Sequence, residues 1–262
     1  MRMKREEMSD YQFTAALDES LTDFITHPGH FVDDIRFVHS LFVYPLVTTS
    51  EKFTLSIQDK TVLPVFTSAE ALTAFKKQVA TPLTYVNQSF VSVVNDLLDQ
   101  EIDAIAFNLQ PAGQDASNAT MLPREHLVTF INRYITILNK LSENEDETKA
   151  DQANYFLIPA FVRTTEDGQV SRTFATLAKP DGESLIPVFT TITSFAKWYD
   201  HPEFGPFFQK NKGSVLAWQL NDLMHPSVGE NDLSGVAGIA IDPFEMASYE
   251  ASILLWKDIT SD

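Results

Sequence analysis

The stretch "LPVFT" at residues 63–67 recurs in the second half of the chain as "IPVFT" at residues 186–190. In both places, apolar residues typical of a strand run into a threonine, which is a favourable residue at the start of a helix. In the first copy, Thr67 and Glu70 have the spacing of a capping box, in which the two side chains satisfy free N–H groups at the helix start. Both stretches therefore predict a junction between a strand and a helix.

Each junction has a proline within its strand, a phenylalanine at the end of the strand and a threonine after it. These residues are Pro64, Phe66 and Thr67 in the first half and Pro187, Phe189 and Thr190 in the second. Because proline has no N–H group for a sheet ladder, we expect an absent or irregular neighbouring strand beside Pro64. The N–H groups at the helix start could also receive an anion, but the pattern favours a structural role.

Other short stretches recur in the same order around these junctions. The stretch "LFVYPLV" (41–47) corresponds to "YFLIPAFV" (155–162), "NDLL" (95–98) to "NDLM" (221–224), and "AIAFN" (104–108) to "GIAID" (238–242). The separation between matching stretches grows along the chain, as it does when a second copy carries longer loops. We therefore predict an internal duplication.

The predicted fold class is α+β, with two similar domains that each pack helices against a mixed, mainly antiparallel sheet. Each domain is expected to contain a leading helix, a three-strand meander, two helices, a further strand and a closing helix. The first domain spans residues 1–141, the acidic stretch 142–153 forms a linker, and the second domain spans residues 154–262.

The periodicity of apolar residues also places individual elements. It predicts a strand over residues 41–47 and a closing helix that begins after Pro123. The spacing of Met246, Tyr249, Ile253 and Trp256 predicts a last helix.

Composition excludes several classes of protein. The 262 residues include 19 Lys and Arg against 36 Asp and Glu, so the net charge is −17 and no basic patch suggests binding to nucleic acid or to an anionic membrane. The absence of cysteine excludes disulfides and thiolate chemistry. No signal peptide or membrane-spanning stretch is visible, so we expect a cytoplasmic protein.

The sequence contains no nucleotide-binding or hydrolase motif. The patterns GxxxxGK[ST], GxGxxG and GxSxG are all absent, and the chain has only 9 glycines for phosphate-binding loops. We therefore assign no catalytic residue and expect no cofactor. An enzymatic function is left open, although the sequence favours a protein without one.

Two clusters could hold a metal ion. His27 and His30 are separated by a Pro–Gly pair, and Asp99, Glu101 and Asp103 alternate along "DQEID". The histidines could be metal ligands, and the carboxylates could bind a hard cation or act as an acid–base pair. The pattern favours an ordinary loop for the histidines and a solvated helix end for the carboxylates.

The stretch "HPEFGPFFQK" at residues 201–210 gathers three phenylalanines, Phe204, Phe207 and Phe208, among prolines and a glycine. This combination is too irregular for a regular strand or helix. The rings are expected either to cover the core of the second domain, which is the favoured interpretation, or to form a patch that binds another protein.

The stretches "LFVYPL", "LPVFTSAEAL" and "DAIAFN" resemble the SseB family of bacterial proteins, whose name refers to enhanced serine sensitivity. In the second half, "FLIPAFV", "LIPVFTTITSF" and "GIAIDPFEM" look like another copy of the same N-terminal-type domain, and together the copies cover about residues 10 to 259. The resemblance implies a cytosolic bacterial protein, carries no catalytic residue to this chain, and hints at serine or sulfur metabolism.

Two functional hypotheses follow. The first is a non-catalytic module that binds another protein or regulates it, because two similar domains occur without a recognisable set of catalytic groups. The second is an enzyme or a binding protein for a small metabolite, such as an amino acid, which requires a deep pocket with convergent polar groups. The oligomeric state is not predicted.

Overall fold

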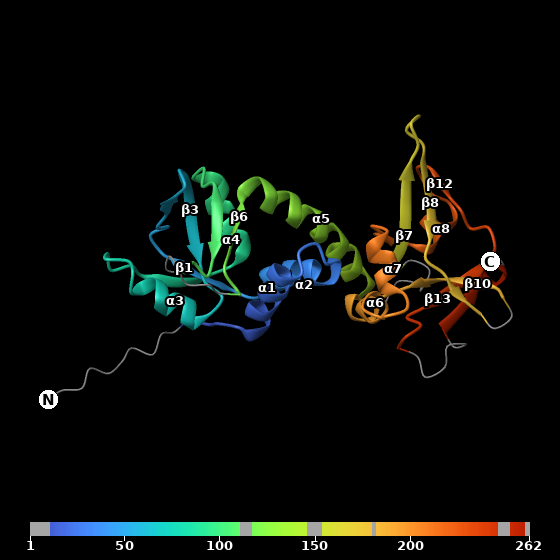
Figure 1. Ribbon diagram of the computed structural model, residues 1–262, viewed down its shortest axis with the longest axis horizontal. Coiled ribbons are helices and arrows are strands. Elements are labelled where there is room, and N and C mark those ends of the chain that lie inside the picture. Colours follow the sequence, from blue (N-terminus) through green and yellow to red (C-terminus); the bar gives the residue numbers. More distant parts are fainter. Residues whose placement is uncertain (1–10, 111–116, 146–153, 180–181, 246–251, 260–262) are drawn as a thin grey trace. The chain divides into compact units, whose positions relative to one another are not determined.

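The computed structural model describes residues 11–110, 117–145, 154–179, 182–245 and 252–259 (Figure 1). The chain divides into two compact units, Met1–Ile135 and Thr136–Asp262. The division falls within helix α5 (Arg124–Ser142), whose last residue is also the first residue of the predicted linker 142–153. Of that linker, Glu143–Glu145 form a single 3₁₀ turn, and residues 146–153 lie outside the described part. Each unit contains both helices and sheets, so the predicted α+β class is confirmed.

The first unit begins with two helices and continues through strands and helices to α5. Its elements are α1 (Ala15–Thr26), α2 (Phe31–Val43), β1 (Leu46–Thr49), β2 (Leu55–Ile57), β3 (Lys60–Val65), α3 (Ala69–Lys76), β4 (Tyr85–Gln88), α4 (Phe90–Asp99), β5 (Ala104–Phe107) and β6 (Thr120–Pro123).

The main sheet of the first unit has the order β2-β3-β5-β6. Strand β2 forms an antiparallel hairpin with β3, whereas β5 runs parallel to β3 because helices lie between them in the chain. Strand β6 closes the edge antiparallel to β5. The parallel return of β5 confirms the predicted mixed sheet.

The predicted three-strand meander is wrong at its first strand. Residues 41–43 continue helix α2, and β1 pairs with β4 in a separate two-stranded sheet. The apolar run 41–47 therefore serves a helix first and a strand afterwards, and Pro45 follows the helix end, where proline cannot continue a helix. Strand β2 pairs with β3 only as far as Val62, so no partner from β2 lies beside Pro64, as predicted.

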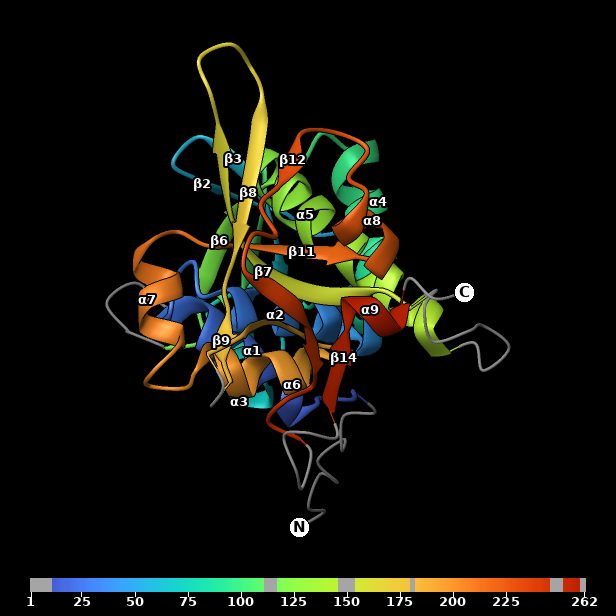
Figure 2. The same cartoon turned by 90° about the vertical axis from the view of Figure 1, so that its right-hand side faces the viewer.

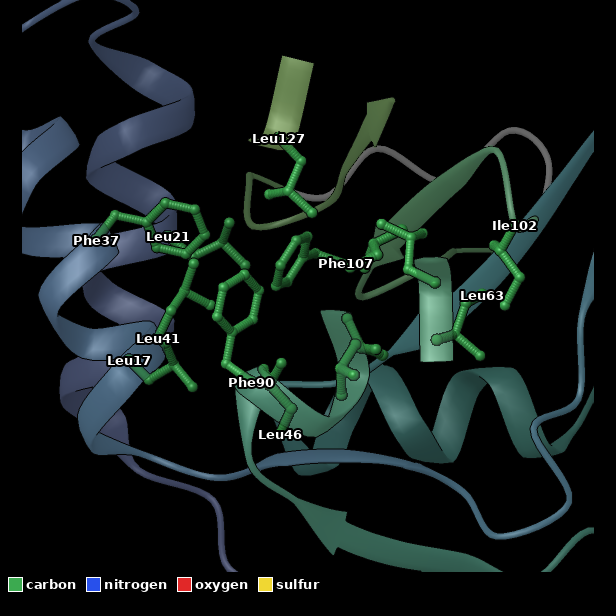
Figure 3. Packing of buried hydrophobic residues seen from close by; sticks show 14 residues of the cluster. Leu17, Leu21, Phe37, Leu41, Leu46, Leu63, Phe90, Ile102, Phe107 and Leu127 are labelled. Carbon is green, nitrogen blue, oxygen red and sulfur yellow. The ribbon is translucent and has the colours of Figure 1, made fainter. Parts of the chain in front are cut away.

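The core of the first unit lies between the helices α1 and α2 and the main sheet. Figure 3 shows Phe90 and Phe107 in the middle of this cluster, between the helical side chains of Leu21 and Phe37 on one side and Leu63 on the other. The aromatic rings of Phe37 and Phe107 meet edge to face with centroids 5.7 Å apart. All these residues are almost fully buried, so their burial is the main stabilising contribution in this unit.

The second unit contains two four-stranded sheets and shorter helices (Figure 2). Its elements are β7 (Phe156–Thr164), β8 (Val170–Phe174), β9 (Leu177–Ala178), β10 (Ser184–Val188), α6 (Ile192–Tyr199), α7 (Gly205–Lys210), β11 (Ser214–Trp218), α8 (Leu220–Met224), β12 (Glu230–Asn231), β13 (Val236–Ile241), β14 (Ile253–Leu255) and α9 (Trp256–Ile259).

One sheet has the order β14-β13-β10-β9 and the other the order β11-β7-β8-β12. Strand β13 runs parallel to β10, as β5 runs parallel to β3 in the first unit. Strands β7 and β8 form the long antiparallel hairpin that is prominent in Figure 2. Strand β11 pairs antiparallel with β7, the first strand of the second unit. In the same way, β4 pairs antiparallel with β1, the first strand of the first unit.

Two sequence predictions are wrong in this unit. Residues 253–255 form strand β14 rather than the last helix predicted from apolar spacing, and part of that predicted helix, residues 246–251, lies outside the described part. Residues 205–210 form helix α7, although they were expected to be irregular. Pro206 lies in the first turn of α7, where no backbone donor is required.

Gly205, the first residue of α7, explains how this helix packs against α6. A Cβ atom at Gly205 would lie 1.8 Å from the carbonyl oxygen of Tyr199, the last residue of α6. Only glycine permits this close approach, so Gly205 allows α7 to begin directly beside the end of α6.

Candidate functional site

The first unit carries an apolar groove, which we define by residues of α2, α4 and α5. Helix α4 begins at Phe90 and is capped by Ser89, whose side chain accepts a hydrogen bond from the N–H of Ser92, 3.3 Å away. Phe90, Val93 and Leu97 on one face of α4 are buried in the core. A second apolar set of α4 faces away from the core, and this set forms one wall of the groove.

The exposed apolar residues of α4 are Val91 and Leu98, with half-exposed side chains at 52% and 50%. Val94 lies between them, partly buried against the core. The spacing of three and four residues places all three on one side of the helix. Helix α4 is therefore apolar on two faces, one buried and one open.

Helix α5 forms the opposite wall. Leu127 is buried in the core, while Val128 and Ile131 are partly exposed and line the groove. At the end of α2, Phe42 is 41% exposed and meets the ring of Phe90 edge to face at 5.5 Å. These residues surround a hollow of about 290 Å³, in which Asn95 and Asn132 are the polar lining residues.

Three exposed carboxylates lie close in sequence to residues of the groove. The backbone N–H of Arg124, the first residue of α5, donates a 2.8 Å hydrogen bond to the carbonyl oxygen of Asp103, so the segment that follows α4 contacts the start of α5. Asp99, Glu101 and Glu125 are all exposed in this region. None of these three carboxylates is among the residues that line the hollow, and the basic residue Arg124 lies beside Glu125 at the start of α5.

The residues of "DQEID" individually have structural roles. Glu101 has a positive φ of 53° just after α4, and the N–H of Ile102 returns to the carbonyl oxygen of Leu97, which ends the helix. Asp103 Oδ2 accepts a 2.8 Å hydrogen bond from the N–H of Thr61. Among the described residues, no group of three or more His, Asp or Glu side chains has the geometry to hold a metal ion.

The histidines of "HPGH" lie beside the start of α2. The Nδ1 atoms of His27 and His30 lie 3.0 and 2.8 Å from the same oxygen, Oδ2 of Asp33. His27 is largely exposed, whereas Asp33 is buried in the first turn of the helix. The histidines are thus brought together, but by a carboxylate that closes the turn between α1 and α2.

The neighbouring residue Asp34 is buried and accepts a 2.6 Å hydrogen bond from the hydroxyl of Tyr134. Burial raises the pKa of Asp34 above its ordinary value, although the hydrogen bond from Tyr134 and the charge of Arg133 oppose this increase. This contact ties α2 to α5.

The three phenylalanines of residues 201–210 have different environments. Phe208 is buried, with its ring centroid 5.1 Å from that of Trp198. Phe207 is 65% exposed, and Phe204 is partly buried against the rings of His201 and Phe244. Phe208 therefore covers the core of the second unit, whereas Phe207 presents its ring to the outside.

The six residues of the repeated signature occupy equivalent places in the two units. Pro64 lies opposite Ala106 in a parallel pair of strands and Pro187 lies opposite Ala240 in another. Phe66 bridges to Val47, and Phe189 bridges to Leu157. The backbone N–H groups of Thr67 and Thr190 both donate at 2.9 Å, to Asn108 Oδ1 and Asp242 Oδ1 respectively.

The predicted capping role of Thr67 is wrong by one residue. Ser68 is the N-cap of α3 and accepts from the N–H of Ala71, because Thr67 is held by Asn108. In the second unit Thr191 caps α6, and Thr190 is held by Asp242. Both threonines therefore fix the strand end and leave the cap to the next residue.

The groove was missed by the sequence reasoning, although a signal was present. In "FVSVVNDLL" (90–98), six of nine residues are apolar, more than one buried helix face requires.

In the described part of the chain, no helix has both the length and the apolar character needed to cross a membrane.

No model of a known protein family matches the chain, and no curated protein is similar to it. Comparison of folds found solved structures that include two Tic22 proteins. Tic22 from Plasmodium falciparum is 12% identical, covering 77% of this chain and 90% of its own, with a TM-score of 0.19. Anabaena Tic22, a protein described by the words "protein transport", is 12% identical, covering 79% and 92%, with a TM-score of 0.20. Such TM-scores do not establish a common fold.

Proposed function

We propose that this chain is an SseB-like, non-catalytic protein-binding or regulatory module of the bacterial cytoplasm, and that it holds a helix of its partner in the apolar groove. The observation that carries the proposal is the second apolar face of α4, where Val91 and Leu98 are half exposed beside the hollow. A soluble helix normally exposes polar residues on its outer face, and contiguous apolar surface marks interaction sites.

The groove suits an amphipathic helix more than an extended peptide. Its walls are two helices, α4 and α5, and partner helices bind such grooves through apolar residues spaced three and four apart. No free sheet edge is needed for this mode of binding. The exposed carboxylates of Asp99, Glu101 and Glu125, which are close in sequence to the lining residues Leu98 and Leu127, favour a partner helix that carries Lys or Arg beyond its apolar face.

Site-specific crosslinking tests this proposal directly. Because the natural chain has no cysteine, a Leu98→Cys variant accepts a thiol-reactive photocrosslinker at the groove alone. A matched Glu166→Cys variant places the same group on an exposed residue of the second unit. The expected result is one partner crosslinked from position 98 and absent from position 166.

Affinity for the partner identified in this way is then measured with purified proteins. Leu98→Asp places a charge in the groove and is expected to weaken binding by at least about tenfold, since a desolvated charge opposes apolar contacts. Val228→Asp, at an exposed apolar residue of the second unit, is the control and is expected to bind normally. Unchanged affinity for Leu98→Asp would exclude the groove as the binding site.

The contribution of these carboxylates is tested separately. The triple variant Asp99→Asn, Glu101→Gln and Glu125→Gln removes the carboxylates while leaving the apolar walls in place. Binding is expected to weaken by about fivefold, with a smaller dependence on salt. If only the Leu98→Asp variant loses affinity, the groove binds the partner, but the predicted preference for a basic partner helix is wrong.

A further inference from the structure

The second unit contains a separate hollow whose walls are mostly aromatic. Its lining includes Trp198 and Phe208, which are almost fully buried, together with Phe161 and the exposed Phe207. The ring of Phe161 lies 5.5 Å from that of Phe208 and 5.9 Å from that of Phe207, measured between centroids. These residues come from β7, α6 and α7, which the close approach at Gly205 brings together.

The hollow also has one charged lining residue, Glu203, which is exposed. Its carboxylate forms no ion pair with any residue in the part of the chain that the structure describes. Its backbone N–H donates to Nδ1 of His201 at 3.2 Å, which holds the turn that carries Glu203 just before α7. An unpaired carboxylate therefore stands at a hollow lined by aromatic rings.

We propose that this hollow binds a small organic cation bearing a methylated ammonium group, with the rings of Phe161 and Phe207 against the methyl groups and the Glu203 carboxylate facing the charge. Aromatic faces carry negative electrostatic potential and attract cations, and quaternary ammonium groups are held in aromatic sites of this kind. The carboxylate adds an attractive charge that a neutral or anionic ligand would not use. The net charge of −17 favours the approach of a cation over long distances.

The size of the hollow limits the ligand. Its volume is about 260 Å³, whereas pockets for drug-sized ligands begin at about 300 Å³. The site is therefore large enough for a quaternary ammonium head group and a short substituent. The same chemistry occurs in free cations such as choline and in the trimethylated lysine of a protein, and these two sources can be separated by experiment.

Isothermal titration of the full chain with choline is compared with titration by 3,3-dimethylbutan-1-ol, the neutral molecule of the same shape. Choline is expected to bind in a saturable manner and at least about fivefold more tightly than the neutral alcohol, because only the cation gains from the rings and the carboxylate. Equal affinities, or no saturable binding by either choline or a trimethyllysine peptide, would overturn the proposal.

Substitutions locate the site. Phe207→Ala and Glu203→Gln are each expected to weaken choline binding by about fivefold or more. Both side chains are exposed, so both variants are expected to fold, and thermal unfolding checks this. Val228→Ala and Glu166→Gln are the matched controls at exposed residues elsewhere in the same unit. Choline binding that survives Phe207→Ala and Glu203→Gln would place the cation elsewhere and exclude this hollow.

A trimethyllysine peptide distinguishes the two sources of the cation. Tighter binding of the peptide than of choline assigns the site to a side chain of a partner protein, and tighter binding of choline assigns it to a free small molecule. Loss of either interaction in Phe207→Ala supports the common chemistry.

Discussion

The two strand–helix junctions have the same backbone geometry, but the residue that stabilises it is a neutral amide in the first unit and a carboxylate in the second. In the first unit Asn108 is fully buried with a φ of 50°, and in the second Asp242 has a φ of 45°. The backbone N–H groups of Asn108 and Asp242 donate to the carbonyl oxygens of Val65 and Val188, the last residues of β3 and β10. Both side-chain Oδ1 atoms accept from a threonine N–H. The backbone geometry is thus independent of whether the residue is an amide or a carboxylate.

The difference lies in where the negative charge comes from. In the second unit Asp242 accepts directly from the hydroxyls of Thr190 and Ser194, each at 2.5 Å. In the first unit Asn108 is neutral, and the carboxylate is supplied by Asp18 of α1, which accepts from the Thr67 hydroxyl and, at 3.2 Å, from Asn108 Nδ2. Helix α1 therefore contacts the first junction through the carboxylate of Asp18. In the second unit the corresponding carboxylate belongs to Asp242, which directly follows β13.

The largest expected effect comes from giving the first junction the residue of the second. Asn108→Asp places a second carboxylate about 3 Å from Asp18 in a buried site, and we expect a loss of about 3 kcal/mol in unfolding free energy at pH 7. Urea denaturation measures this loss.

The double variant Asp18→Asn, Asn108→Asp is the control for this prediction. It exchanges the amide and the carboxylate, so the first junction gains the charge placement of the second. We expect it to recover most of the lost stability. If the single variant is as stable as the natural chain, the two carboxylates do not share the site as described.

Removing the charge instead of duplicating it should have an intermediate effect. Asp18→Ala leaves the Thr67 hydroxyl and Asn118 Nδ2, which donates to Asp18 Oδ1 at 2.9 Å, without this acceptor. We expect a loss of about 2 kcal/mol, because partly buried donors lose a charged partner. Amide hydrogen exchange should increase in α1 and not in the second unit. Equal exchange throughout the chain would show that Asp18 does not act locally.

The reverse exchange in the second unit should be tolerated better. In Asp242→Asn, the amide oxygen can still accept from the N–H of Thr190, and its NH₂ group can donate to the Thr190 hydroxyl, as Asn108 does to Thr67 at 2.6 Å. We expect a loss of about 1 kcal/mol in urea denaturation. A loss as large as that of Asn108→Asp would mean that the second junction depends on the charge itself.

The smallest effect is expected at Asp34, in the first turn of helix α2. Since burial raises the pKa of Asp34, its contribution to stability is fully present below the unfolded pKa and is lost as pH rises through the folded value. Asp34→Asn stays neutral and can still accept from Tyr134. We expect a small gain in stability at pH 7 that vanishes below about pH 4. A gain that is equal at both pH values would contradict the role of ionisation.

Much of this architecture was predictable from local sequence. The strand–helix junctions, the hairpin of β2 and β3, and the parallel return of β5 follow from alternation and from turn residues. The correspondence between Asn108 and Asp242 was also visible, although its hydrogen bonds were not. The internal duplication stays a prediction, as does the SseB resemblance.

The remaining elements depend on contacts that no local pattern encodes. Strands β4 and β11 are short, and they become strands by pairing with β1 and β7. The apolar spacing of residues 246–256 suggested a helix, but Ile253–Leu255 pair with β13, because tertiary pairing outweighs periodicity in a short segment. The groove could not be predicted without knowing that α5 lies opposite α4. The role of Asp18 could not be predicted without knowing that α1 contacts Thr67, which is 49 residues away in the sequence.

The exposed side chains of Phe42, Val91 and Leu98 also affect the behaviour of the free chain in solution. Copies of the chain repel one another through their net charge of −17, and this repulsion keeps their grooves apart. The screening length falls from about 10 Å at 0.1 M salt to about 3 Å at 1 M. Concentrated salt therefore weakens this repulsion, so the chain is expected to associate with itself through the exposed groove as ionic strength rises.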